Sequence, residues 1–205
     1  MGPGSSTEAR HVPAPRLGPQ ARRTLLDIAR RSIVHGLAHG RPLPVEAGAF
    51  PPPLSEPGAA FVTLHHGGRL RGCIGSLEAR RPLVTDVAEN AWAAAFRDPR
   101  FPPLTPAELA GLAVHVSVLG PPEPLPPAAS EAEAAALLRP GIDGVILEAD
   151  GRRGTFLPAV WEQLPDPARF LRHLKLKAGL PQEGWSPSYR LWRYTTESFG
   201  EDEDG

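Results

Sequence analysis

The alternation of hydrophobic and polar residues is clearest between Leu112 and Val118, where every second side chain is apolar. A period of two is typical of a β-strand that buries one face. Residues 61–65 also form a strand pattern, and Gly67-Gly68 before Arg69–Arg71 predicts a tight turn into a returning strand. Three further strands are predicted: residues 145–148, 153–157 and 189–195. Asp150-Gly151 joins the first two of these into a second hairpin.

Helical spacing is clearest in the stretch after residue 20, where apolar residues recur every three or four positions. Asp166 before Pro167 is typical of a capped helix start, and Ser130 and Glu133 have the spacing of a capping box. Four helices are therefore predicted: residues 20–39, 82–97, 130–138 and 167–177.

The order of these elements indicates the fold class. Hairpins and helices follow one another without a repeated strand–helix–strand unit, so we expect an α+β fold with a mostly antiparallel sheet flanked by helices. Residues 1–19 are rich in Pro, Gly, Ser and Arg and are predicted to be a disordered leader. The folded domain is expected to span residues 20–196, and the acidic residues 197–205 are expected to form a flexible tail.

The composition excludes several kinds of protein. The chain has 205 residues, of which 41% are hydrophobic, and its net charge is −1. These values suit a globular domain and give no electrostatic sign of nucleic-acid binding. No apolar run approaches the roughly 20 residues of a membrane helix, and the first residues do not resemble a secretory signal. The single cysteine rules out an intramolecular disulfide, so the reducing cytoplasm is the expected compartment.

Cys73 is the first candidate for chemistry. It stands between Gly72 and Gly75, where the backbone can approach a ligand closely, and Arg71 lies two residues before it. A nearby guanidinium favours the thiolate, which is the reactive form of cysteine. The alternative is a small buried side chain that fills a bend in the strand. The residues alone leave both interpretations open.

A thiol nucleophile normally needs a base, and the nearest histidines do not fit the expected hairpin. If Gly67-Gly68 is a two-residue turn, His66 faces Arg69, Leu64 faces Arg71 and Val62 faces Cys73. His66 then lies about 13 Å along the sheet from Cys73, at ~3.4 Å per residue. The neighbouring histidine points to the opposite face, so the pair cannot easily share a metal ion and no metal site is expected. Two more distant histidines are possible bases whose position the sequence does not give: His115 and His173.

Residues 98–104 form a second unusual stretch, because Asp98 and Pro99 end a predicted helix. Arg100 could bind an anion there. Alternatively, Asp98 pairs with Arg100, and Phe101 fills the core. Cys73 is thus the candidate catalytic residue, and five residues are candidates for a binding cleft: Arg71, Gly72, Gly75, Asp98 and Arg100.

The segment Leu70-Arg71-Gly72-Cys73-Ile74-Gly75 resembles the signature hexapeptide of the AMMECR domain family. The bacterial and archaeal members of this family are called AmmeMemoRadiSam system protein A. The resemblance covers about residues 20–196 and is also carried by five other segments: Phe61–Leu64, Ala93–Phe101, Gly144-Val145, Leu157-Pro158 and Lys177–Leu180 with Trp185.

The resemblance implies a main body and a smaller subdomain around a cleft, but it implies no settled activity and leaves any cofactor unknown. It places the hexapeptide residues and Asp98, Arg100 and Phe101 at the site. Members are often encoded with, or fused to, a Memo-like protein and a radical S-adenosylmethionine enzyme, which are therefore the expected partners. Many relatives have a second cysteine where this chain has Lys175, so a two-thiol mechanism is in doubt here.

Two functions follow from these observations. The first is a thiol-dependent enzyme or modification factor of an AmmeMemoRadiSam-type pathway, in which Cys73 reacts and Arg71 and Arg100 bind an anionic group. The second is a non-catalytic binding or scaffold partner of the Memo-like protein and the radical enzyme. Nucleic-acid binding through the arginines of residues 22–31 is a third possibility, disfavoured by the neutral net charge and the absence of interleaved aromatic residues.

Overall fold

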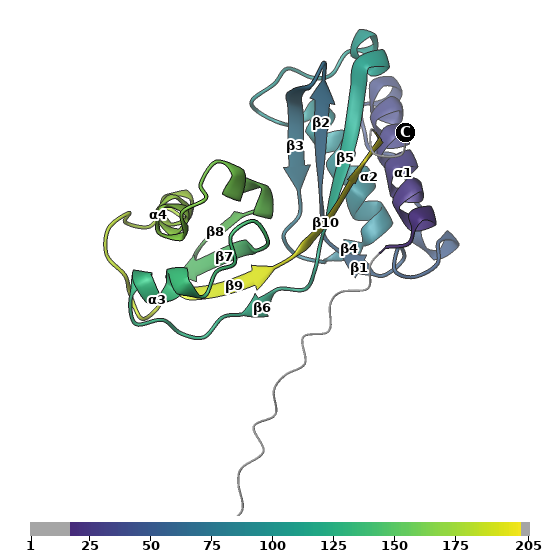
Figure 1. The fold of residues 1–205 in the computed structure, drawn as a ribbon. Helices are drawn as coiled ribbons and strands as arrows, with labels where there is room; N and C mark the ends of the chain where they lie inside the picture. Colours follow the sequence, from purple (N-terminus) through teal and green to yellow (C-terminus); the bar gives the residue numbers. More distant parts are fainter. Residues whose placement is uncertain (1–16, 202–205) are drawn as a thin grey trace, which may run out of the picture.

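The chain forms two lobes that stand side by side in the computed structural model, which describes residues 17–201 (Figure 1). Each lobe contains a four-stranded antiparallel sheet and its own hydrophobic cluster. The first lobe comprises residues 17–119 and 196–201, and the second comprises residues 123–194. The predicted α+β fold with antiparallel sheets is confirmed.

The first lobe packs two helices, α1 (Pro19–His39) and α2 (Leu83–Phe96), against one face of its sheet. The strand order is β10-β5-β2-β3. Alternate residues of β2 and β5 are buried beneath the helices, which explains the period of two in the sequence. The four strands span Thr196–Gly200, Leu112–Leu119, Ala60–His66 and Arg69–Gly75. The short elements of this lobe are η1 (Ala47–Ala49), η2 (Pro106–Gly111) and the paired strands β1 (Pro57–Gly58) and β4 (Arg81–Pro82).

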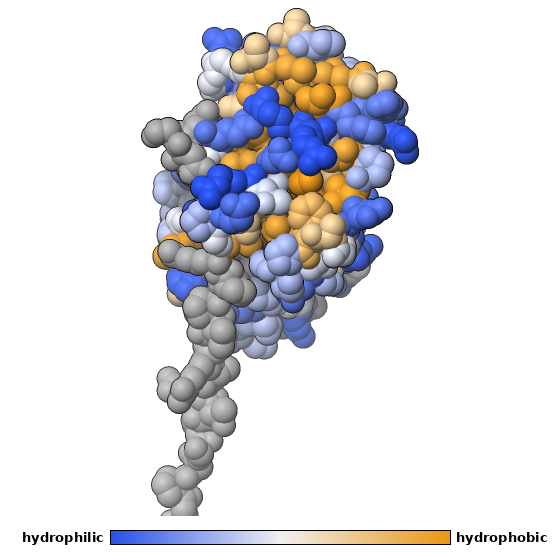
Figure 2. Space-filling view, turned by 90° about the vertical axis from the view of Figure 1, so that its right-hand side faces the viewer, coloured by the Kyte–Doolittle hydropathy of each residue, from blue (hydrophilic) through white to orange (hydrophobic). Residues whose placement is uncertain are grey.

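The outer side of α1 faces solvent and carries both polar and apolar residues. Arg23, Asp27 and Arg31 are exposed there, as is Val34. Figure 2 shows this side of the molecule, with hydrophilic side chains lying among hydrophobic ones. No helix within residues 17–201 has the length and apolar character needed to cross a membrane.

The second lobe has the strand order β6-β9-β7-β8, and α3 (Glu131–Ala136) and α4 (Pro167–Lys177) pack on it. The predicted caps are present, since Ser130 Oγ accepts from the Glu133 N–H at 3.2 Å and Asp166 accepts from the Arg169 N–H at 2.8 Å. The indole of Trp161, on η3 (Pro158–Glu162), stacks on Phe170 with 3.8 Å between ring centroids. The four strands span Glu123–Pro124, Arg190–Tyr194, Gly144–Ala149 and Arg152–Phe156.

Two short connections join the lobes, residues 120–122 and Thr195. The Gly120 N–H donates to the Thr195 carbonyl at 2.8 Å, so the antiparallel ribbon of β5 and β10 continues into β6 and β9. Figure 1 shows β9 running directly into β10. The second lobe is thereby held beside the face of the first sheet that the helices leave open.

Both ends of the folded part extend beyond the predicted boundaries. Leu17 is buried and its N–H donates to Glu197 at 2.9 Å, while Glu201 accepts from Arg30 at 2.6 Å. Residues 17–19 and 197–201 therefore belong to the first lobe and not to a leader or a tail. The acidic composition concealed β10, because Glu197 on this strand and Glu201 directly after it pair with arginines of α1. The rest of both predictions, on residues 1–16 and 202–205, lies outside the described residues.

Candidate functional site

Cys73 lies on β3, an edge strand of the first sheet, and Thr63 is its partner on β2. The turn before β3 is the predicted one, since Gly67 and Gly68 have φ values of 57° and 75°. The hydroxyl of Thr63 donates a hydrogen bond to the sulfur, with Oγ1 and Sγ 3.3 Å apart. The thiol therefore has a hydroxyl donor on the neighbouring strand.

A β-bulge at Arg71 produces this partnership. Near the turn, His66 pairs with Arg69 and His65 pairs with Leu70, as predicted. The next pair is Leu64 with Gly72, so Arg71 has no partner on β2 and forms the bulge. The predicted pairs beyond that point, including Val62 with Cys73, are therefore wrong by one residue. The extra residue is the physical reason that Cys73 faces a hydroxyl-bearing side chain instead of a buried valine.

Gly72 and Cys73 point to opposite sides of the sheet. A Cβ at Gly72 would lie 2.1 Å from the carbonyl oxygen of Ala94, so the backbone of α2 rests directly on this residue. Ile74 packs against the same core. Cys73 is half-buried on the face that the helices do not cover, which looks toward the second lobe.

Arg71 does not act on the thiol in the way the sequence suggested. Its side chain is buried beside η2, where Nε donates to Glu108 at 2.6 Å and Nη2 donates to the Pro102 carbonyl at 2.9 Å. The hydrogen bond from Arg71 is the main cause that lowers the pKa of Glu108 to about 2. Arg71 is thus committed to a structural ion pair, and the geometry does not support it as an anion-binding residue.

Asp98 and Arg100 hold the free edge of β3 at Cys73. Asp98 Oδ2 accepts from the Cys73 N–H at 2.9 Å, and Arg100 Nη2 lies 3.4 Å from the Cys73 carbonyl oxygen. The carboxylate also receives Arg100 Nε at 3.0 Å and Nη2 at 2.7 Å. The Arg100 side chain is the main cause that holds the pKa of Asp98 well below its usual range, against the opposing effect of burial. Both residues therefore meet Cys73 through its backbone.

Phe101 lies between two guanidinium groups. The Cζ atoms of Arg71 and Arg100 are 5.9 Å and 5.5 Å from the centre of its ring. Cations over an aromatic face are attracted by the negative face of the ring. Phe101 therefore contacts both arginines beside β3, and it is half-buried outside the two hydrophobic clusters, so the predicted filling of the core is not observed.

A cleft of about 870 Å³ opens between the lobes, and of the predicted site residues it is lined by Gly75, not by Cys73, Asp98 or Arg100. Phe61 and Gly75 line it from the first lobe, while β8 and Lys177 line it from the second. A Cβ at Gly75 would lie 2.2 Å from the Phe61 ring, so only glycine fits against that ring. Because Cys73 shares a sheet face with Phe61, the thiol lies on the side of β3 that borders the cleft.

Lys177, the last residue of α4, brings a positive charge to the cleft. Its Nζ lies 5.0 Å from the centre of the Phe156 ring. The pKa of Lys177 is lowered, mainly because the ammonium group is partly desolvated. The electrostatic interaction with Arg100 also lowers this pKa, whereas the interaction with Cys73 opposes the shift. The charges of Cys73, Arg100 and Lys177 therefore act on one another across the lobe boundary.

The basic residues of α4 differ in their exposure. Arg169, Arg172 and Lys177 are exposed, whereas Lys175 is 0% exposed, with Nζ paired to Glu131 and donating to the Gly184 carbonyl at 2.8 Å. The position that holds a second cysteine in many relatives is therefore buried inside the second lobe and does not line the cleft.

The two histidines that the sequence offered as distant bases, His115 and His173, lie in different lobes. His115 is opposite Thr63 in the ladder, but its ring leans over Gly200, where an added Cβ would lie 2.3 Å from Nδ1. It also meets His65 edge-on, with 5.1 Å between ring centroids. His173 is exposed on α4. Within residues 17–201, no group of three or more His, Cys, Asp or Glu side chains is placed to hold a metal ion.

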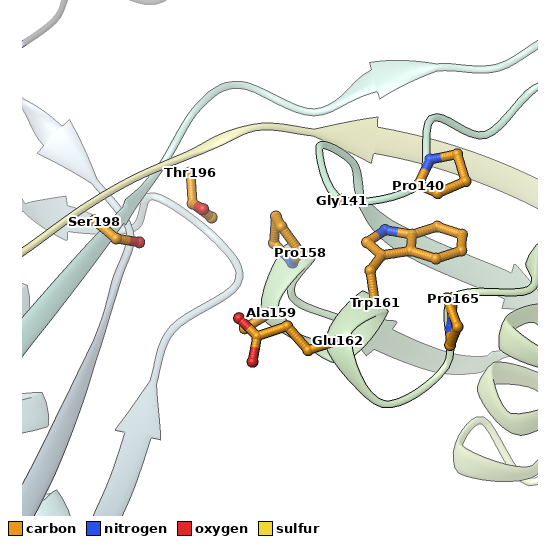
Figure 3. A pocket seen from close by; sticks show the side chains of 9 residues that line it. All are labelled: Pro140, Gly141, Pro158, Ala159, Trp161, Glu162, Pro165, Thr196 and Ser198. Carbon is orange, nitrogen blue, oxygen red and sulfur yellow. The ribbon is translucent and has the colours of Figure 1, made fainter.

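A second hollow, of about 460 Å³, lies at the opposite edge of the first sheet (Figure 3). Thr196 and Ser198 of β10 form one side of it, and Trp161 lies among prolines on the other. Glu162 is the charged residue of its lining. None of the candidate catalytic or binding residues predicted from the sequence lines this hollow, whereas Gly75 lines the cleft between the lobes, which is therefore the candidate functional site.

Comparisons with known proteins agree with the fold and the motifs. The AMMECR1 family model matches residues 26–199. A protein of Methanothermobacter thermautotrophicus is 41% identical over 182 residues, which cover 88% of this chain and 94% of that protein. Protein MK0488 of Methanopyrus kandleri is 38% identical over 186 residues and 87% of each chain. The crystal structure of the uncharacterised protein PH0010 from Pyrococcus horikoshii is similar with a TM-score of 0.78, at 35% identity, and the match covers 88% of this chain and 91% of that one.

Proposed function

This chain belongs to the AMMECR1 family, and from that premise we propose that it is a Cys73-dependent enzyme or modification factor of an AmmeMemoRadiSam-type pathway. Its substrate would be a small molecule held in the cleft between the lobes. One observation carries the proposal. The half-buried thiol lies on the open sheet face at the cleft, with the hydroxyl of Thr63 on its sulfur and the charges of Arg100 and Lys177 beside it.

The chemistry that this arrangement supports is nucleophilic attack by sulfur. The Thr63 hydroxyl donates a hydrogen bond to the sulfur, and Arg100 and Lys177 bring positive charge to it from the two lobes. The thiol releases its proton to solvent and the sulfur lone pair forms a bond to an electrophilic atom of the substrate. The bond that breaks at this atom leaves its electron pair on the substrate or on the departing group. Lys177 and Arg100 are placed to stabilise negative charge that develops there. Asp98 fixes the backbone of Cys73 during the attack.

We expect Cys73 in the folded protein to react with iodoacetamide about fivefold faster than free cysteine at pH 7, because the proposed function requires a thiol that its surroundings activate. Intact-mass spectrometry over time measures the rate, and Cys73→Ser is the unlabelled control. A folded protein that is labelled more slowly than the same chain in urea would remove the catalytic proposal. The reducing cytoplasm, where we place the protein, would keep this thiol free.

One specific observation favours the second candidate, a non-catalytic binding or scaffold partner of the Memo-like protein and the radical S-adenosylmethionine enzyme. Gly72 packs on the backbone of α2, and Asp98 and Arg100 cap the edge of β3, so much of the signature has a structural use. The effect of Cys73→Ser in the pathway separates the two functions, and size-exclusion chromatography with each purified partner shows that its complexes still form. Under the scaffold function, this variant keeps both its complexes and its effect in the pathway. Under the enzyme function, it keeps only the complexes.

A further inference from the structure

The walls of the cleft carry more positive than negative charge. Six charged side chains line it. Four of them are basic and two are acidic: Arg80, Arg81, Arg153 and Lys177, and Glu78 and Asp86. Whether this surplus is available to a ligand depends on how many of these groups are already paired within the fold.

Arg81 and Asp86 are committed to the first lobe. Asp86 is buried on α2, where it accepts from the Ala60 N–H at 2.9 Å and from Ser76 Oγ at 2.7 Å. Arg81 Nε donates to the same carboxylate at 2.8 Å, and Arg81 also pairs with Glu89. These two residues hold β4 and α2 together and leave no charge for a ligand.

Glu78 is the acid that remains among three cations of the cleft wall. Its Oε2 accepts from Arg80 Nε at 2.7 Å, and its Oε1 pairs with Arg153 Nη1 of β8. One carboxylate thus bridges a guanidinium group from each lobe. Proteins bind the carboxylate or phosphate group of a ligand in this same way, with guanidinium donors on separate oxygens.

The bridge is accessible and can be displaced. The side chains of Glu78 and Arg80 are 42% and 80% exposed, and ion pairs between exposed groups contribute little to stability. If Glu78 swings into solvent, Arg80, Arg153 and Lys177 face the cleft without an acid among them. Three cations suit a group with two negative charges.

The position of this cluster relates it to Cys73. Glu78 follows the end of β3, and Gly75 lies between it and the thiol. Cys73 and Gly75 are about 7 Å apart along the strand, at ~3.4 Å per residue. Lys177 lines the same cleft and its charge interacts with that of Cys73. A small molecule anchored at the arginines would therefore extend along β3 toward the sulfur.

We propose that Arg80, Arg153 and Lys177 form a subsite for the phosphate or carboxylate group of a small dianionic molecule, and that the Glu78 carboxylate occupies this subsite until the molecule binds. The inference rests on the proposed function, because it names the substrate class of the same cleft. Glu78 is the internal competitor of the ligand in this arrangement. Its removal should strengthen anion binding, and removal of Arg153 should weaken it.

Isothermal titration of the full chain with inorganic phosphate and, separately, with succinate tests the subsite. We expect Glu78→Gln to bind at least one anion about fivefold more tightly than the wild type, because the competing carboxylate is removed. We expect Arg153→Gln to bind the same anion about tenfold more weakly, because the charge-assisted hydrogen bonds of its guanidinium group are lost. Glu162→Gln is the matched control, since it removes one negative charge at the second hollow. Tighter binding of phosphate assigns a phosphate ester as the ligand, and tighter binding of succinate assigns a dicarboxylate.

The subsite is overturned if Glu78→Gln binds neither anion, if Arg153→Gln binds as the wild type does, or if Glu162→Gln gains as much as Glu78→Gln. Alkylation of Cys73 separates this result from the proposed function. Fast labelling without anion binding would remove the subsite alone. Anion binding by a chain with an unreactive Cys73 would remove the enzyme alone.

Discussion

Replacing Gly72 by alanine is expected to lower the free energy of unfolding by about 3 kcal/mol or more. The new Cβ would stand 2.1 Å from the carbonyl oxygen of Ala94 and 3.0 Å from its carbonyl carbon. Both are backbone atoms of α2, so no side chain can rotate out of the way. The helix would have to move off the sheet, and its buried residues, such as Val84 and Val87, would lose their packing.

Urea unfolding followed by circular dichroism measures this loss. Gly48→Ala is the control, because a Cβ at Gly48 meets no atom within 4 Å and its φ is not positive. We expect the control to change stability by less than about 0.5 kcal/mol. A Gly72→Ala protein as stable as the control would show that β3 does not rest on α2 as described.

Replacing Asp98 by alanine is expected to cost about 2–4 kcal/mol at pH 7, because a buried carboxylate with charge-assisted hydrogen bonds is removed. The side chain is only 2% exposed and holds the Cys73 N–H, the Arg100 N–H and the Arg100 guanidinium. Its loss leaves the edge of β3 without its acceptor. Asp27→Ala, which removes an exposed acid paired with Arg31, is expected to cost less than about 0.5 kcal/mol.

The effect of Asp98 should depend on pH in a defined direction. Its pKa in the folded chain lies well below the ordinary value of 3.8, so below that value the unfolded chain binds more protons than the folded chain. The stabilisation is therefore fully present above the ordinary pKa and declines as the pH falls toward the folded pKa. In urea unfolding, the gap between wild type and Asp98→Ala should be smaller at pH 3 than at pH 7. A constant gap would contradict the pKa shift.

The elements with strong local signals were predicted correctly from the sequence. Helix α1 follows from the recurrence of apolar residues, and the turn at Gly67-Gly68 follows from residues that tolerate a positive φ. The bulge at Arg71 was not predicted, because it depends on the docking of α2 against Gly72 and on the pairing of Arg71 with Glu108. That single extra residue changed the partner of Cys73 from Val62 to Thr63.

The site was predicted only where its residues are close in the sequence. The signature strand and the segment that caps it were recognised, and the alternative in which Asp98 pairs with Arg100 is confirmed, but the ion pair of Arg71 with Glu108 was not predicted. Arg71, two residues from Cys73, is used in packing, whereas Arg100 comes back to the same backbone from 27 positions along the chain. Lys175 and Lys177 have similar sequence surroundings, yet one is buried against Glu131 and the other lines the cleft. Only tertiary contacts distinguish them.

Replacing Lys177, the cation that the second lobe brings to the cleft, tests whether the two lobes form one site. The property compared is the reactivity of Cys73. The measurement is the iodoacetamide rate at pH 7 for the wild type, Lys177→Met and Arg169→Met. Iodoacetamide is neutral, so the substitutions act on the thiol and not on the reagent. Arg169 is an exposed cation on the same helix and does not line the cleft, so its variant controls for the change in net charge.

We expect Lys177→Met to react about threefold more slowly than the wild type, because the proposed function gives Lys177 an electrostatic role at the sulfur. Added salt screens this interaction and should slow the wild type toward the same rate. Arg169→Met should keep the wild-type rate. Equal rates for all three proteins, or an equal loss in both variants, would show that Lys177 does not act on the sulfur and that the cleft is not a shared reaction site.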